Sequence, residues 1–246
     1  MIDKIRRSVN NTAKTHNMRP RTIWLDIFLR VLLFTSAFVQ IFFGETAIGI
    51  ITLICLLVIT LPNVFTRKLI PYIPIEIEIL LLVMVLIQFV IGEARDFYTT
   101  VPYYDKFVHL MLPMFMGIIG FIIFYTMYRT GKLHTTTRMM MVLVFFLTLG
   151  IGAAWEIVEY SSDQIIYPRV EGWHKFQGSL TEDPLHDTMN DLIADAAGGI
   201  LGIILALRYV TWANMHNKRR LGQLVKELSR DNTIPPSSLE SNTTME

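Results

Sequence analysis

The stretch HDTMNDLIADAAGGILG, residues 186–202, decides the fold, because it places charged residues at the start of a segment that belongs in lipid. Its aspartates Asp187, Asp191 and Asp195 recur at the spacing of one face of an α-helix. The segment continues without interruption into IILALRYVTW, residues 203–212, which is apolar enough for a membrane interior. The sequence therefore predicts a membrane helix over 188–211 with a stripe of carboxylates at one end.

Further apolar segments of similar length precede this helix. Hydrophobic residues make up 52% of the chain and charged residues 17%, and segments such as VLLFTSAFVQIFF (31–43) show no polar helix face. Membrane-spanning helices are predicted at about 22–43, 46–65, 75–94, 106–128, 139–160 and 188–211. The predicted fold class is an all-α polytopic membrane helix bundle with about six transmembrane helices.

Lysine and arginine residues give the predicted orientation. They are concentrated in the two tails and in the loops after the second and fourth predicted helices. By the positive-inside rule both tails are cytoplasmic, as an even number of spans requires. We expect a basic tail over 1–21, a membrane domain over 22–211 with an outer loop at 161–186, and a cytoplasmic tail over 212–246 whose distal end is disordered. The basic residues indicate topology and anionic headgroups, so membrane lipid is the expected partner and nucleic acid is not.

Titratable side chains converge near the predicted outer ends of the last three helices. The fourth helix opens and the fifth closes with such residues, just as the sixth opens with the aspartates. At a rise of ~1.5 Å per residue, all but Asp195 lie within roughly 10 Å of the outer boundary, and Asp195 lies about two turns deeper. The set is Asp105, His109, Glu156, Glu159, Asp187, Asp191 and Asp195.

The helical faces favour an inward orientation of these groups. At ~100° per residue, Ala194, Gly198 and Gly202 fall on the same arc of the sixth helix as the aspartates. Gly152 shares one side of the fifth helix with Glu156. Small residues let membrane helices approach closely, so we expect the carboxylates to face neighbouring helices rather than lipid.

Three motifs resemble a known family. YDKFVH (104–109), AWEIVEY (154–160) and GSLTEDPLHDTMNDLIADAAGG (178–199) are similar, in order and spacing, to the YjdF-like family of bacterial inner-membrane proteins. The resemblance covers residues 75–205 and implies a multi-pass protein of the bacterial inner membrane, without supplying a reaction. The chain departs from the pattern at His186 and Asn190, where the family can have tryptophan. A fainter resemblance, to VanZ-like membrane proteins, rests on Asp-Lys-x-x-His, Asp-x-x-x-Asp and a glycine-rich span.

The cluster predicts a divalent metal cofactor. Carboxylates and imidazole are ligands of hard and borderline divalent ions, and the spacings i, i+3 and i, i+4 place pairs of ligands on one helix face. Without an ion, carboxylates crowded this closely must take up protons. The predicted metal ligands are Asp105, His109, Glu156, Glu159, Asp187 and Asp191; the candidate catalytic residues are Glu156, Glu159 and Asp191; and the supporting residues are Glu93, Tyr104, His186 and Asp195.

Plainer interpretations exist for single residues. Asp187 is also compatible with a simple N-terminal cap of the sixth helix. Asp26 and Arg30 are expected to form a local ion pair on the first helix, and Glu78 is expected at the cytoplasmic rim of the third.

Three functional hypotheses remain open. The first is a metal-dependent enzyme that acts on a lipid or lipid-linked substrate at the outer face, with Trp173, His174, Gln177 and Gly178 in a loop long enough to be a lid. The second is a transporter or proton-coupled carrier, which is disfavoured because no ionisable residues continue down the last three helices to the cytoplasmic side. The third is a non-catalytic subunit held together by a polar network. The sequence does not set the oligomeric state.

Overall fold

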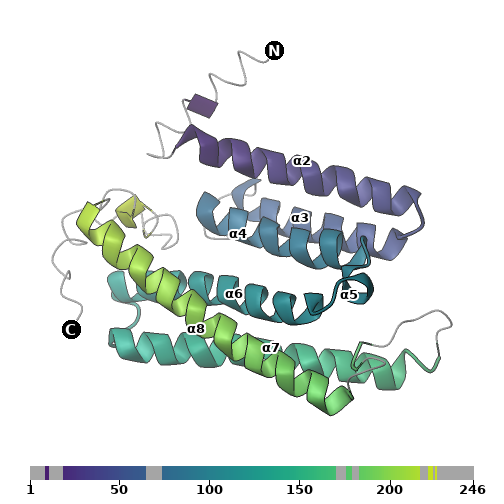
Figure 1. The fold of residues 1–246 in the computed structure, drawn as a ribbon. Coiled ribbons are helices and arrows are strands. Elements are labelled where there is room, and N and C mark those ends of the chain that lie inside the picture. The colour runs from purple at the N-terminus through teal and green to yellow at the C-terminus, as the bar shows by residue number, and fades with distance from the viewer. Residues whose placement is uncertain are drawn as a thin grey trace. The chain divides into compact units, whose positions relative to one another are not determined.

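The computed structural model describes residues 9–10, 19–64, 74–169, 176–178, 183–216, 221–223 and 225. In this part of the chain every regular element is a helix, and five helices are long and apolar enough to cross a membrane. The predicted class, an all-α polytopic membrane helix bundle, is confirmed. The helices group into two compact units, which are described separately below (Figure 1).

The first unit contains the N-terminal helices. They are α2 (Pro20–Phe42), α3 (Thr46–Val64), α4 (Ile75–Val85), the π-helical η1 (Leu86–Glu93) and the short α5 (Phe97–Thr100). Gly44, with φ +104°, turns the chain between α2 and α3, a conformation that glycine adopts without strain. Helices α2, α3 and α4 lie side by side around a core that includes Leu29, Leu33 and Leu82 (Figure 1).

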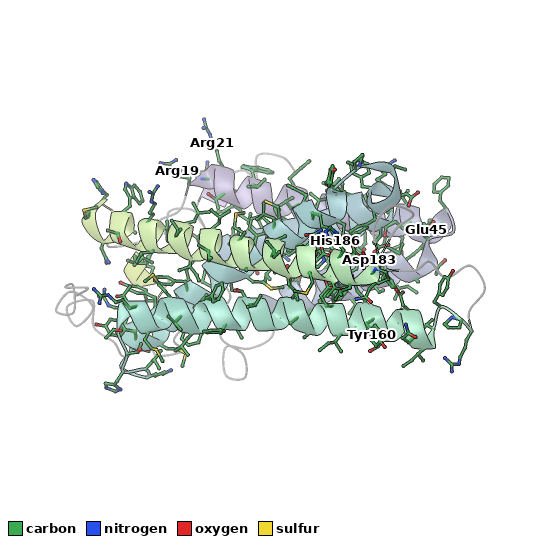
Figure 2. The ribbon with its side chains drawn as sticks, turned by 60° about the horizontal axis from the view of Figure 1, so that its bottom comes forward. Arg19, Arg21, Glu45, Tyr160, Asp183 and His186 are labelled. Carbon is green, nitrogen blue, oxygen red and sulfur yellow. The ribbon has the colours of Figure 1, made fainter. Side chains whose placement is uncertain are left out.

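Helix α3 differs from the other predicted spans in length. Its described apolar part is Thr46–Leu61, which is shorter than the five helices that qualify as full spans. The predicted helix at 75–94 is α4 followed directly by η1. Figure 2 places Arg19 and Arg21 at one end of this unit and Glu45 at the other.

An ionic network joins three helices of the first unit. Arg30 donates to Asp26 Oδ2 at 2.9 Å, as the local ion pair requires. The same guanidinium reaches Glu78 Oε2 at 2.9 Å and donates to Thr60 Oγ1 at 2.6 Å. The expected pair is therefore present, and Glu78 is a buried partner in it rather than an isolated residue at the rim.

The second unit is built from α6 (Tyr104–Arg129), α7 (Thr137–Ile165) and α8 (Pro184–His216), up to Ile122 of α6 and Leu207 of α8. Glycines allow α6 and α8 to touch through their backbones. A Cβ added to Gly198 would lie 2.2 Å from the carbonyl oxygen of Leu110, and one added to Gly202 would lie 2.1 Å from that of Met114. The row of small residues therefore faces α6, as its position beside the aspartates predicts.

Helices α7 and α8 extend beyond their predicted apolar limits. The segment 161–186, predicted as an outer loop, contains the end of α7 to Ile165 and the start of α8 from Pro184. Hydropathy marks the part of a helix that lies in hydrocarbon, whereas polar residues can continue the helix beyond it. Asp183 Oδ1 accepts hydrogen bonds from the backbone N–H groups of Leu185 and His186, at 3.1 and 3.2 Å, so Asp183 rather than Asp187 caps α8.

Candidate metal centre

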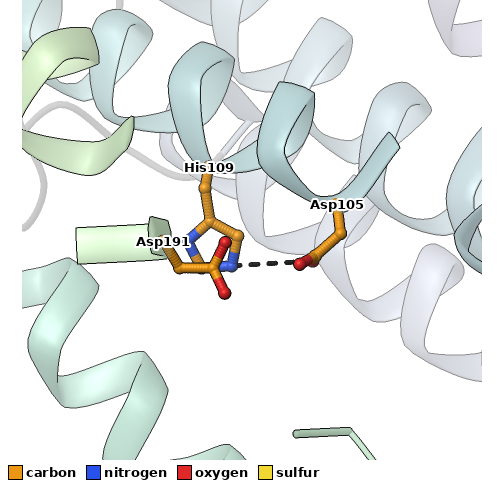
Figure 3. Close-up of side chains that lie close together, drawn as sticks. All are labelled: Asp105, His109 and Asp191. Carbon is orange, nitrogen blue, oxygen red and sulfur yellow. Dashed lines mark ion pairs between the residues drawn. The ribbon is translucent and has the colours of Figure 1, made fainter. Parts of the chain in front are cut away.

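Polar side chains from α6, α7 and α8 meet at one end of the second unit. Figure 2 shows Tyr160 of α7 and Asp183 and His186 of α8 at this same end. The potential ligand atoms of Asp105, His109 and Asp191 lie within 4.8 Å of one another (Figure 3). These three residues are able to hold a metal ion, and all three belong to the predicted ligand set.

His109 is the centre of the cluster and has carboxylates on both sides of its ring. On one side Nδ1 lies 3.1 Å from Asp195 Oδ1, at hydrogen-bond distance. On the other side Nε2 lies 3.8 Å from Asp105 Oδ1 and 3.7 Å from Glu156 Oε1. The latter distances exceed a hydrogen bond, so Nε2 and the two carboxylates face one another across a gap.

The position of Asp195 depends on a glycine in α7. A Cβ added to Gly152 would lie 1.9 Å from Asp195 Oδ2. No other residue type leaves room at this position for the carboxylate in its observed place. Asp195 is almost fully buried, and it contacts His109 Nδ1 from a position one helical turn beyond Asp191.

Lys106 bridges the acidic residues of α6 and α8. Its Nζ lies 2.5 Å from Asp187 Oδ1, 2.8 Å from Asp191 Oδ1 and 3.2 Å from Asp105 Oδ2. The lysine therefore supplies a positive charge inside the predicted ligand set. Sequence reasoning placed Lys106 in the YDKFVH motif but gave it no role; its position between Asp105 and His109 was the available signal.

A short segment, residues 176–178, is tied to the ends of α7 and α8. The carboxylate of Asp163 accepts hydrogen bonds from the backbone N–H groups of Phe176 and Gln177, both at 2.8 Å. Gly178 N–H donates to Asp187 Oδ2 at 2.8 Å. Asp187 thus links this segment to Lys106, and Asp163 is a structural residue that sequence reasoning missed.

The predicted lid can be described only in part. Gln177 is buried, and its amide nitrogen donates to Thr188 Oγ1 at 2.9 Å. Trp173 and His174 lie outside the described residues.

The remaining predicted site residues have other contacts in the structure. Glu159 Oε1 accepts a hydrogen bond at 2.7 Å from Nε1 of the exposed Trp155, one turn earlier in α7. The buried Tyr104 packs against Phe107, with ring centroids 5.9 Å apart, and the exposed His186 lies 3.1 Å from the Asn190 amide. Glu93 ends η1, in the first unit.

The cluster contains more acidic than basic groups. Six carboxylates surround the two cationic side chains Lys106 and His109, the histidine being cationic only when protonated. Both carboxylate oxygens of Glu156 and Oδ2 of Asp195 are buried without a hydrogen-bond partner among the described residues. A buried carboxylate is stabilised by a cation or by a proton, so the cluster has room for further positive charge. The six carboxylates belong to Asp105, Glu156, Glu159, Asp187, Asp191 and Asp195.

Comparisons with known proteins indicate that the chain is a membrane protein. A family model described as Predicted membrane protein (DUF2238) matches residues 22–212, so the match includes the first two helices, on which no motif was identified. A protein of Thermotoga maritima described as uncharacterized is 26% identical over 139 residues, which are 56% of this chain and 65% of that relative. No solved structure matches the chain. Together with the helices, the family match shows a multi-pass membrane protein, and it gives no support to the VanZ-like resemblance.

Proposed function

The chain belongs to the predicted membrane protein family DUF2238, and we propose that it is a metal-dependent membrane enzyme. In this proposal a divalent ion is held by Asp105, His109, Glu156 and Asp191. The substrate is a lipid or a lipid-linked molecule that reaches the site at the membrane surface. The observation that carries the proposal is the orientation of His109, whose Nε2 faces acidic side chains while Asp195 holds Nδ1.

The surroundings of His109 support the metal ion. A histidine that binds a metal donates its other ring N–H to a carboxylate or carbonyl, which fixes the ring and makes it a better ligand. Asp195 stands in that position. The Nε2 separations of 3.7 and 3.8 Å from Glu156 and Asp105 are too long for direct hydrogen bonds and close to the separation of two ligands around one ion.

Glu156 gives independent support. Only 4% of the surface of Glu156 is exposed. Neither of its carboxylate oxygens receives a hydrogen bond of normal geometry among the described residues. Two groups beside this carboxylate are the Thr188 hydroxyl and the Gln177 amide, which are neutral donors and supply no positive charge. An ionised carboxylate that is buried without a paired cation is unfavourable by on the order of several kcal/mol, and a bound cation lowers that penalty.

The depth of the cluster supports a substrate from the lipid phase. The path along α7 from Arg138 to Glu156 is about 27 Å at the α-helical rise, close to the ~30 Å thickness of the hydrocarbon layer. With Arg138 at one membrane surface, Glu156 is at the other. The exposed aromatic residues Trp155 and Tyr160 lie at the same level of α7, where aromatic side chains anchor helices at the interface.

The distribution of basic residues places this surface on the extracytoplasmic side. The resemblance of the three motifs to the YjdF-like family, which the family match does not test, supports a location in the bacterial inner membrane. Both assignments are part of the proposal.

The proposed chemistry uses water as the nucleophile. Asp105, His109, Glu156 and Asp191 would hold the ion, and the ion would supply Lewis-acid activation of water when bound. Glu156 is the first candidate for the base that would accept the proton of that water, because Oε1 faces His109 Nε2 and would bind the ion, which leaves Oε2 as the proton acceptor. Glu159 and Asp191 remain the other candidates.

A metal measurement tests the proposal. We would purify the wild type in mild detergent without chelator, load it with Mn²⁺ or Zn²⁺, and determine bound metal per chain by elemental analysis. The wild type and the His134→Gln control, which changes an exposed histidine between α6 and α7, should each retain about one ion. His109→Gln and Glu156→Gln should lose it. A wild type that binds no divalent ion contradicts the proposal.

A non-catalytic polar network is the second candidate function. The bridge from Lys106 to Asp187 and Asp191 favours it, because this bridge neutralises part of the acidic cluster without any ion. The same measurement separates the two, since a network of this kind holds its shape with no metal bound.

A further inference from the structure

We infer that the ammonium group of Lys106 occupies a second cation position in the cluster, so that the centre accepts one exchangeable ion instead of two. The inference rests on the proposed function for the first ion. In this inference Lys106 limits the number of metal ions that the cluster binds. Its ammonium group lies among the carboxylates of Asp187 and Asp191.

The surroundings of Lys106 Nζ resemble a metal coordination sphere. Carboxylate oxygens lie at 2.5 Å (Asp187), 2.8 and 2.9 Å (both oxygens of Asp191) and 3.2 Å (Asp105), with the backbone oxygen of Asp187 at 3.4 Å. An ammonium group has only three N–H donors, which is fewer than these oxygens. An all-oxygen shell with both oxygens of one carboxylate is instead typical of Ca²⁺.

Two carboxylates connect this position with the His109 side. Asp105 directs Oδ1 toward His109 Nε2 and Oδ2 toward Lys106 Nζ. Asp191 contacts Lys106 and also contributes to the group of potential ligands with Asp105 and His109. Shared carboxylates between neighbouring cations are the arrangement of two-metal sites. In this chain one of the two cations is part of the protein.

The centre therefore has two cation positions. One has the His109 nitrogen among its ligands, and the other has oxygen ligands only. The His109 position suits an ion that accepts imidazole, such as Zn²⁺ or Mn²⁺, whereas the Lys106 position offers oxygen ligands alone. Removal of the ammonium group opens the oxygen-only position. Asp187, Asp191 and Asp105 then select a hard cation.

The substitution Lys106→Met tests the inference, because methionine has similar length and no charge. Ca²⁺ binding would be measured by calorimetric titration of the detergent-purified full chain, after one equivalent of Mn²⁺ has been added to fill the His109 position alone. Lys106→Met should bind one Ca²⁺ more than the wild type. The control Lys132→Met, an exposed residue in the turn after α6, should bind the wild-type number.

The double variant Lys106→Met/Asp187→Asn is a second test. It removes one carboxylate of the vacated shell, so the added Ca²⁺ should be lost again while the Mn²⁺ stays. Equal Ca²⁺ numbers in Lys106→Met and the wild type overturn the inference. A Lys106→Met protein that stays unfolded with Ca²⁺ present also overturns it, because an ion in the vacated position should replace the lysine.

The failure of this inference is distinguishable from that of the proposed function. A wild type without Mn²⁺ and a Lys106→Met variant that gains one Ca²⁺ refute the first metal position and support the role of Lys106. A wild type with one Mn²⁺ and a variant with no Ca²⁺ refute the role of Lys106 alone.

Discussion

Replacing Gly152 with alanine should weaken metal binding, because the added methyl group would displace Asp195 from His109. The new Cβ would lie 1.9 Å from Asp195 Oδ2, whereas ordinary contacts of a Cβ begin at 3.4 Å. The Asp195 carboxylate must therefore move by roughly 1 Å or more, because packed interiors do not tolerate such overlap. Its hydrogen-bond distance of 3.1 Å to His109 Nδ1 then exceeds the limit for a hydrogen bond.

The expected loss follows from the role of such supporting carboxylates. Removal of the hydrogen-bond partner of a metal-binding histidine lowers metal affinity by about 10–100-fold, or roughly 1.4–2.8 kcal/mol. The overlap should also lower the free energy of unfolding by about 1–3 kcal/mol, partly offset by the ~1 kcal/mol advantage of alanine over glycine in a helix. Calorimetric titration of Mn²⁺ into the detergent-purified protein measures the affinity, and thermal unfolding measures the stability.

Gly150→Ala is the matched control in the same helix. No atom lies within 4 Å of a Cβ added there, so this variant should bind Mn²⁺ as the wild type does and unfold at an equal or higher temperature. Asp195→Ala should lower the affinity by a similar factor, and the double variant with Gly152→Ala should show no further loss, since both changes remove the same contact. Wild-type Mn²⁺ affinity in Gly152→Ala would refute the reasoning.

Two further predictions concern stability. Gly202→Ala should lower the free energy of unfolding by about 1–3 kcal/mol, because its Cβ would meet the backbone oxygen of Met114 at 2.1 Å and force α6 and α8 apart; an unchanged melting temperature would contradict the close helix contact. Arg30→Met should destabilise the first unit by roughly 3–5 kcal/mol, because it removes the cation that pairs with the buried carboxylates of Asp26 and Glu78. Arg30→Lys, which keeps the charge but not the three-way contact, should fall between the two in a thermal unfolding series, and equal stability of all three proteins would refute a structural role.

The helical class of the protein was predictable because lipid leaves the backbone little choice. Apolar segments of about 20 residues have to satisfy their N–H and C=O groups internally, so they form helices. The ends of the helices were less predictable. Helix α7 continues to Ile165 through polar residues, and Asp183 caps α8 before its apolar part begins, because helix ends are set by capping groups rather than by hydropathy.

The composition of the site was predictable in part. Asp105, His109 and Asp191 could be placed together because helical rise alone brings them to one level. The height of each group along its helix did not predict which group it contacts. Lys106, adjacent to Asp105 in sequence, proved to be the cation between α6 and α8, whereas Glu159 bonds to Trp155. Their roles as metal ligands or catalytic groups stay predictions.

The sequence by itself therefore determined which segments are apolar helices and that the acidic groups share a common level, since hydrophobicity and helical rise are properties of position along one helix. Only the tertiary structure decided which groups touch, because contact depends on the rotation of each helix and on how closely its neighbour approaches. Gly152 and Gly198 set that approach in the second unit by leaving room for Asp195 and for the backbone of α6. As a result Asp195 reaches His109 Nδ1, and the opposite side of the ring faces Asp105 and Glu156.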